Sequence, residues 1–213
     1  MTLAKMIEGD KLDAIGGFTT GNLELDGRNT LTFNVESHKD GMPLYFKDLR
    51  DNKYIFFRAY IEGLTENISP SWTSTNYIGR SEPVYVYERS ERDITFTLRM
   101  VAQTSDELEM IYQKMNKLTS LCYPQYRADV NLGGKIKMKP PLTKFRLGEL
   151  FGKSKNELMG FIKSLNYSID QSSTWETKKG KRVPRHVTAN ITYQVIHASV
   201  PQLDTQFYGY VGD

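Results

Sequence analysis

Alternating hydrophobic and polar positions dominate the chain from about residue 54 onward and predict an antiparallel β protein. In the clearest segment, 93–101, apolar residues occupy the even positions from Ile94 to Met100 and polar residues the odd ones. Residues 159–169 and 186–196 alternate in the same way. The apolar face of the second comprises Val187, Ala189, Ile191, Tyr193 and Val195. These patterns indicate strands with one face in a core.

Other segments predict shorter strands. Tyr54–Ile61 is dense in aromatic and β-branched residues, which is typical of a strand buried on both faces. Further short strands are expected at 83–87, 135–139 and 142–147. The stretch 67–80, between two of these strands, is interpreted as a long loop, and loops of that length are usually functional.

One helix is expected, over residues 104–120. Thr104 and Glu107 have the spacing of a capping box, in which the threonine oxygen accepts from an amide of the first turn. The apolar stripe that follows, at spacings of three and four, is Leu108, Ile111, Met115 and Leu118. Pro124 marks the end. The stripe indicates core packing.

The order of elements suggests three regions. Residues 1–50 are the least regular and are interpreted as an N-terminal extended segment, with strand-like alternation at 31–35. Residues 51–200 form the β domain, with the helix at 104–120 and a long hairpin at 159–196. The hairpin's polar connection, 170–185, favours a hairpin that projects from the body. Residues 201–213 form a C-terminal tail.

Composition narrows the possible classes of protein. The chain has 213 residues, enough for a core without disulfides, and its one cysteine, Cys122, excludes an intramolecular disulfide. We expect no signal peptide, no membrane helix and no membrane partner, because the longest apolar run is four residues. Residues 1–100 have a net charge of −3 and residues 101–213 one of +6. This asymmetry fits either ordinary solvated surface or a basic face for a partner.

Candidate chemistry is sparse. The histidines His38, His186 and His197 have no metal-ligand spacing, and the chain contains no phosphate-binding loop and no nucleophile elbow. We therefore expect no catalytic residues, no metal and no cofactor, and a protein that is not an enzyme. The basic loop 178–185 fits a solvated hairpin tip, or phosphate contacts in a nucleic-acid-binding β-barrel.

Exposed aromatic side chains and basic loop residues are the candidate interface instead, because tryptophan and tyrosine bury much area at little cost in rotamer entropy. The candidate interface residues are Trp72, Tyr77, Trp175, Lys178, Lys179, Lys181, Arg182, Tyr208 and Tyr210.

Several short pieces, in order, resemble the tail-tube initiator, or baseplate–tail-tube junction, proteins of contractile-tailed bacteriophages. They are the stretch 79–87 (GRSEPVYVY), the helix 108–121, the strand opening 140–142, the stretch 159–170 with Trp175–Glu176, and the return 183–187. The resemblance covers about residues 54–200.

The resemblance implies a tail-tube-like antiparallel β-sandwich or barrel with a flanking helix. It implies a homo-hexameric ring, made in the host cytoplasm and built into the virion baseplate, whose strands line a channel for the passage of phage DNA. Its implied partners are the tail-tube protein on one face and the baseplate hub with neighbouring baseplate proteins on the other. A main tail-tube subunit or another hub component is the close alternative.

Overall fold

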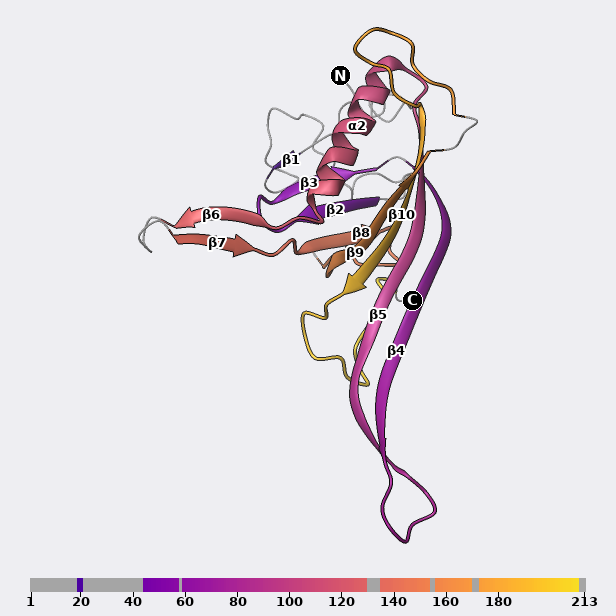
Figure 1. The fold of residues 1–213 in the computed structure, drawn as a ribbon, viewed down its shortest axis with the longest axis vertical. Coiled ribbons are helices and arrows are strands. Elements are labelled where there is room, and N and C mark those ends of the chain that lie inside the picture. The colour runs from indigo at the N-terminus through magenta and orange to yellow at the C-terminus, as the bar shows by residue number, and fades with distance from the viewer. Residues whose placement is uncertain are drawn as a thin grey trace.

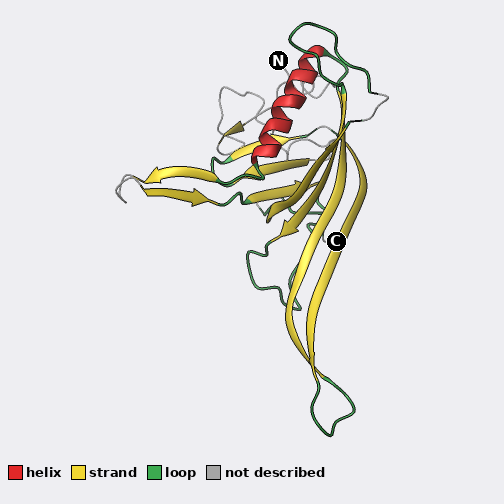
Figure 2. Cartoon of the chain, in the orientation of Figure 1, coloured by secondary structure: helices red, strands yellow, loops and turns green. Residues whose placement is uncertain are grey.

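The computed structural model describes residues 19–20, 44–57, 59–129, 135–153, 156–169 and 173–210. Within these ranges, eight strands form one antiparallel sheet in the order β1-β3-β2-β8-β9-β10-β5-β4, and β6 and β7 pair separately (Figure 1). The single helix of the described residues, α2, packs on the sheet (Figure 2). The mainly β class with one flanking helix is thus confirmed.

The elements have the following bounds: β1 Thr19–Thr20, β2 Leu44–Asp48, β3 Lys53–Phe56, β4 Tyr60–Thr75, β5 Val84–Val101, α2 Ser105–Ser120, β6 Gln125–Asp129, β7 Lys135–Lys139, β8 Thr143–Leu147, β9 Leu158–Ser168 and β10 His186–Val195.

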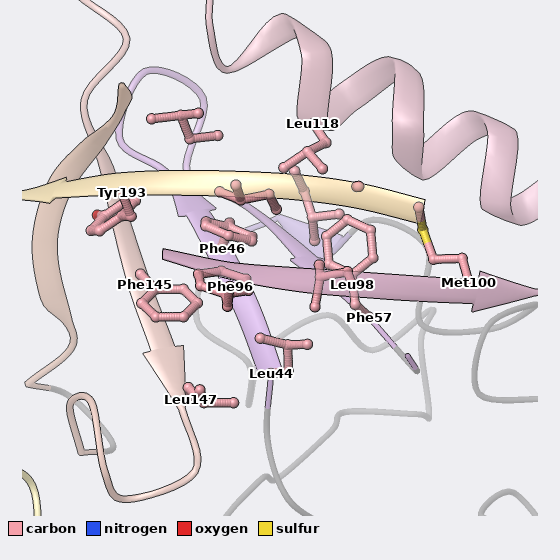
Figure 3. Packing of buried hydrophobic residues seen from close by; sticks show 14 of the residues in the cluster. Leu44, Phe46, Phe57, Phe96, Leu98, Met100, Leu118, Phe145, Leu147 and Tyr193 are labelled. Atoms are coloured by element: carbon pink, nitrogen blue, oxygen red, sulfur yellow. The ribbon is translucent and has the colours of Figure 1, made fainter. Parts of the chain in front are cut away.

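The sheet folds over on itself, so that one sheet provides two packed layers. β2 and β8 are separated from β5 by β9 and β10 in the sheet order, yet Phe46 and Phe145 contact Phe96 with ring centroids 6.4 and 5.2 Å apart (Figure 3). Tyr193 of β10 lies 5.3 Å from Phe145. These rings form the centre of the core, and their packing gives the sandwich-like arrangement expected from the sequence.

The fold-over occurs between β8 and β9, which share only three residue pairs. Gly160 lies at this point, and a Cβ there would come within 2.1 Å of the Gln194 carbonyl oxygen and 2.7 Å of the Tyr193 ring. The Tyr193 hydroxyl, packed beside it, donates to the carbonyls of Thr143 and Leu158 at 2.9 and 3.2 Å. The absence of a side chain at residue 160 therefore lets the two layers approach.

The helix begins and ends as the sequence predicts. Thr104 accepts from the Glu107 amide, and the Glu107 carboxylate accepts from the Thr104 amide, which confirms the capping box. Leu108, Ile111 and Leu118 are buried in the main core with the apolar face of β10. The helix therefore covers the core-facing side of the sheet.

An ion-pair cluster joins the end of α2 to the β2–β3 turn. The buried Asp48 carboxylate accepts from the Arg50 guanidinium at 2.9 Å and from Lys117 at 3.1 Å, and Lys117 also pairs with Asp51 at 2.8 Å. Arg50 donates in turn to the carbonyl of Ser120. Burial raises the pKa of Asp48, but the bonds from Arg50 and Lys117 outweigh it and hold this pKa below its ordinary value.

Four interpretations need correction. Residues 54–61 are not one strand buried on both faces, because β3 ends at Phe56, β4 begins at Tyr60, and Tyr60 is exposed. The body begins before residue 51, because β2 lies between β3 and β8 and Phe46 is fully buried. The segment 67–80 is not a long loop, because β4 continues to Thr75 and pairs with a single long strand, β5. The 159–196 hairpin does not project, because β9 and β10 lie inside the sheet. The strand expected at 31–35 lies outside the described residues.

Candidate assembly interface

The projecting element is the distal part of the β4–β5 hairpin, residues 67–91, which we call the arm. It extends from the body along the long axis of the molecule, away from α2 (Figure 1). In β5, buried and less buried positions alternate from Arg92 to Met100, and every residue from Tyr85 to Ser90 is exposed. A two-stranded ribbon alone is marginally stable in water, so a long bare ribbon indicates a partner.

Cross-strand register shows that the arm has two different faces. Paired residues share a face, and the core-facing pair Glu66–Ile94 is followed outward by the pairs Ile68–Arg92, Pro70–Ser90, Trp72–Tyr87 and Ser74–Tyr85. Between Ser71 and Trp72 the register shifts by one residue. This shift brings Tyr87 and Tyr85 onto the same side as Trp72.

The core-facing side of the arm is therefore an apolar surface left uncovered. Trp72 and Tyr87 meet edge-on with centroids 5.2 Å apart and are 57% and 51% exposed, while Ile68 and Tyr85 are 54% and 63% exposed. Arg92 lies at the base of the arm, and none of the paired residues farther out on this side is charged. We call it the arm's apolar face.

The opposite side of the arm is polar apart from Val84 and Val86 near the tip. Glu88 is the extra residue at the register shift, and its carboxylate accepts hydrogen bonds from the hydroxyls of Ser71 and Thr73, which hold its pKa below the ordinary value. Arg89 pairs with Glu91 at 3.0 Å on the same side. The contrast between the two sides is the pattern of a surface that docks by one face.

A second surface covers the outer side of β4, β5, β10 and β9, facing away from α2 and the core. Rows of side chains cross the four strands on this side. One central row consists of Thr65, Thr95, Thr192 and Ser164, and the next consists of Glu62, Thr97, Asn190 and Asn166. Thr97 donates to Asn190 at 2.7 Å. The charges on this side are paired, Glu62 with Arg99 at 3.8 Å and Asp93 with Lys163 at 2.8 Å. We call it the neutral polar face.

The candidate residues named from the sequence do not form one surface. Trp72 lies on the arm's apolar face and Tyr77, also exposed, lies in the turn at its tip. Trp175, Lys178, Lys179, Lys181 and Arg182 lie in the connection between β9 and β10, at the opposite end of the long axis (Figure 1). Tyr208 and Tyr210 lie in the tail.

The β9–β10 connection contacts the helix. Lys181 pairs with Glu109 at 3.2 Å and donates to Ser105 at 3.4 Å, and the Tyr112 hydroxyl donates to the Pro184 carbonyl at 3.1 Å. Lys178, Lys179, Arg182 and Trp175 remain exposed. This end of the molecule thus presents cations, whereas the arm presents an uncharged apolar face.

Sequence reasoning missed Ile68, Tyr85 and Tyr87. The string Val84-Tyr85-Val86-Tyr87 alternates two residue types that are both apolar, so it predicts a strand without indicating which side is exposed. The deciding feature is the register shift opposite Trp72, which no pattern in the string shows.

The described residues also bear on a metal site, a membrane-spanning helix and a reactive thiol. They hold no group of three or more His, Cys, Asp or Glu side chains that could hold a metal ion. None of their helices is long and apolar enough to cross a membrane. Cys122 is half-buried against the core, and burial raises the pKa of its thiol, which lowers its reactivity.

Comparison with solved structures gives distant likenesses. No family model and no curated protein matches the chain. A solved chain described as "Tail of empty GTA particle computed with helical refinement, C6 symmetry" aligns with 73% of this chain and 92% of its own length, at 10% identity and a TM-score of 0.33. The two backbones superpose too loosely to transfer a role to this chain.

Proposed function

We propose that the protein is a non-enzymatic structural subunit of a contractile phage tail, which assembles as a ring at the baseplate–tail-tube junction. The observation that carries the proposal is the arm's apolar face, an uncovered extension of the core-facing side of β4 and β5. An uncharged aromatic surface of this kind fits a protein partner, because affinity for the phosphate backbone requires Lys and Arg.

The neutral polar face supports a position beside passing DNA. A channel wall for DNA must neither bind phosphates tightly nor repel them. Hydroxyl and amide side chains with paired charges meet both conditions, since counterion release by unpaired cations supplies most non-specific affinity. Four neighbouring strands, β4, β5, β10 and β9, provide this surface together.

The two ends of the molecule support a junction role. The arm at one end and the β9–β10 connection at the other differ in charge and in apolar character, which fits two different partners. In the proposal these partners are the first ring of tube protein and the baseplate hub. Head-to-tail contacts around the ring close when the rotation between subunits permits, and six copies are proposed.

Assembly of the purified protein tests this proposal. Native mass spectrometry and electron microscopy, with the cognate tube and hub proteins, should detect a closed ring that nucleates tube growth. A monomer that recruits neither partner at any concentration would refute the ring. Copy number per particle separates an initiator, present as one ring, from a main tube subunit, present in many.

DNA binding tests the alternative of a nucleic-acid-binding β-barrel. The proposed channel wall predicts weak association without a steep dependence on salt. Tight binding at low salt that falls steeply with added salt would favour the alternative, with Lys178, Lys179 and Arg182 as its contacts.

A further inference from the structure

Arg92 lies at the point where the arm leaves the body. It is the last buried residue of β5 before the exposed stretch and is 3% exposed, although no other charged residue of β5 is buried. A guanidinium is rarely buried unless its charge and its donors are matched. The groups that surround Arg92 therefore show which segments are joined at this junction.

Two strands and the tail converge on Arg92. Its Nε donates to the Glu66 carboxylate of β4, and both Nη atoms lie 3.3 Å from the Phe207 carbonyl of the tail. Its guanidinium also lies over three rings, at 5.4 Å from the centroid of Tyr208, 5.8 Å from Phe207 and 5.9 Å from Phe151. Arg92 thus joins β5, β4, the tail and the segment after β8.

The tail is attached at two further points. The Tyr208 hydroxyl donates to Glu66 at 2.7 Å, and this bond, together with partial burial, raises the pKa of Tyr208. The Gly209 amide donates to the Leu150 carbonyl at 3.2 Å. Gly209 is buried, and a Cβ there would come within 2.3 Å of the Glu149 carbonyl oxygen and 2.5 Å of the Gly152 carbonyl oxygen. The tail is therefore closely fitted to the body.

We propose that residues 206–209 act as a brace that fixes the direction in which the arm leaves the body, with Arg92 as the residue through which the brace holds both strands. One end of the brace is fitted to the body at residues 149–152, and the other is bonded to Glu66 and Arg92 at the base of the arm. A link of this kind across a junction restricts bending there.

The brace has a consequence for docking. A ribbon that is free to swing must be ordered when it meets its partner, whereas one held in a fixed direction avoids that cost. The inference concerns the isolated chain and does not depend on the ring, so its test and the assembly test can fail separately.

The test measures the distance between arm and body in the full-length chain. Spin labels are placed on exposed positions by Thr75→Cys and Ser168→Cys, in a Cys122→Ala background. Pulsed electron resonance then gives the distribution of distances between them. With the brace intact we expect one narrow peak. Gly209→Ala, which unseats the tail without changing any side chain of the arm, should abolish that narrow peak, and so should Arg92→Met.

Two matched variants are controls. Arg89→Met removes an exposed arginine from the same strand, and Leu203→Ser changes a fully exposed position of the tail; both should keep the narrow peak. The near-ultraviolet circular dichroism of each variant verifies that the body remains folded.

Each pattern of results decides the matter. A narrow peak in either folded variant, Gly209→Ala or Arg92→Met, overturns the brace. Broadening in Arg92→Met alone has the same meaning, because Arg92 would then stiffen the arm through Glu66 without the tail. If Arg92→Met does not fold, Gly209→Ala gives the answer, and Tyr208→Phe should then show partial broadening through loss of the bond to Glu66.

Discussion

Removal of the two central aromatic side chains of the arm should weaken assembly strongly and leave the monomer folded. The perturbation is the double variant Trp72→Ala, Tyr87→Ser. In the monomer these rings contact each other outside the core, and such a pair is worth about 0.5–1.5 kcal/mol. The thermal midpoint of the body should therefore change little, because the core around Phe96 is untouched.

The effect on association should be much larger. Trp72 and Tyr87 are 57% and 51% exposed, so docking would remove on the order of 100 Å² of each from water, or about 2.5 kcal/mol per residue at 25 cal/mol per Å². Energies at such positions are not additive, and a combined loss of about 3 kcal/mol is a cautious figure. It corresponds to an association constant roughly 100-fold or more lower.

Sedimentation velocity over a concentration series, alone and with the tube protein, measures this change. The matched control is Val86→Ser, which removes an exposed apolar side chain from the same strand on the opposite face of the arm. The control should assemble as the parent does. Equal losses in both variants, or normal assembly of the double variant, would refute docking by the apolar face.

Four other perturbations probe the body. Phe96→Ala removes a fully buried ring between the two layers and should lower the free energy of unfolding by about 3–5 kcal/mol in urea titrations. Thr104→Ala should cost about 1 kcal/mol by the same titration through loss of the helix cap. Gly160→Ala should be poorly soluble, because its Cβ would collide with the Gln194 carbonyl. The pKa of Asp48 is lower in the folded state, so the stabilisation that its carboxylate gives is complete above the unfolded pKa and is lost as pH falls through the folded pKa. In Asp48→Asn the free energy of unfolding should therefore depend less on pH below about pH 4.

The body of the fold follows from local patterns in the sequence. The alternation in β10 predicts which side is buried, and Val187, Ile191 and Tyr193 are all buried as expected. The capping box predicts the start of α2 to within one residue. Both features depend on residues close together in the chain, where side-chain spacing and backbone geometry are directly linked.

The arm could not be identified in the same way, because a hairpin projects only where no other element packs against it, and local sequence patterns do not show which elements are neighbours. β4 is polar along most of its length, which is equally typical of a loop, and β9 and β10 alternate as a projecting hairpin would. Only the sheet order distinguishes them: β9 and β10 each have a neighbour on both edges, whereas β4 is an edge strand of the described sheet. Its pairing with β5 depends on contacts up to about 40 residues apart, such as Tyr60 with Arg99.

The single extra residue at Glu88 decides what the arm offers to a partner. If Glu88 were instead paired opposite Trp72, strict alternation outward from Ile94 would place Val84 and Val86 on the side of Trp72, and both tyrosines on the polar side with Ser71 and Thr73. In the observed register, Trp72 gains Tyr87 as an edge-on neighbour, and Glu88 is held on the other side by two hydroxyls. Insertion of one serine between Ser71 and Trp72 would give Glu88 a partner and restore one-to-one pairing, so the distal aromatic side chains should turn together to the other side of the arm. In sedimentation velocity this variant should fail to assemble although every aromatic residue is retained, whereas deletion of Glu88, which leaves Tyr87 opposite Trp72, should assemble as the parent does.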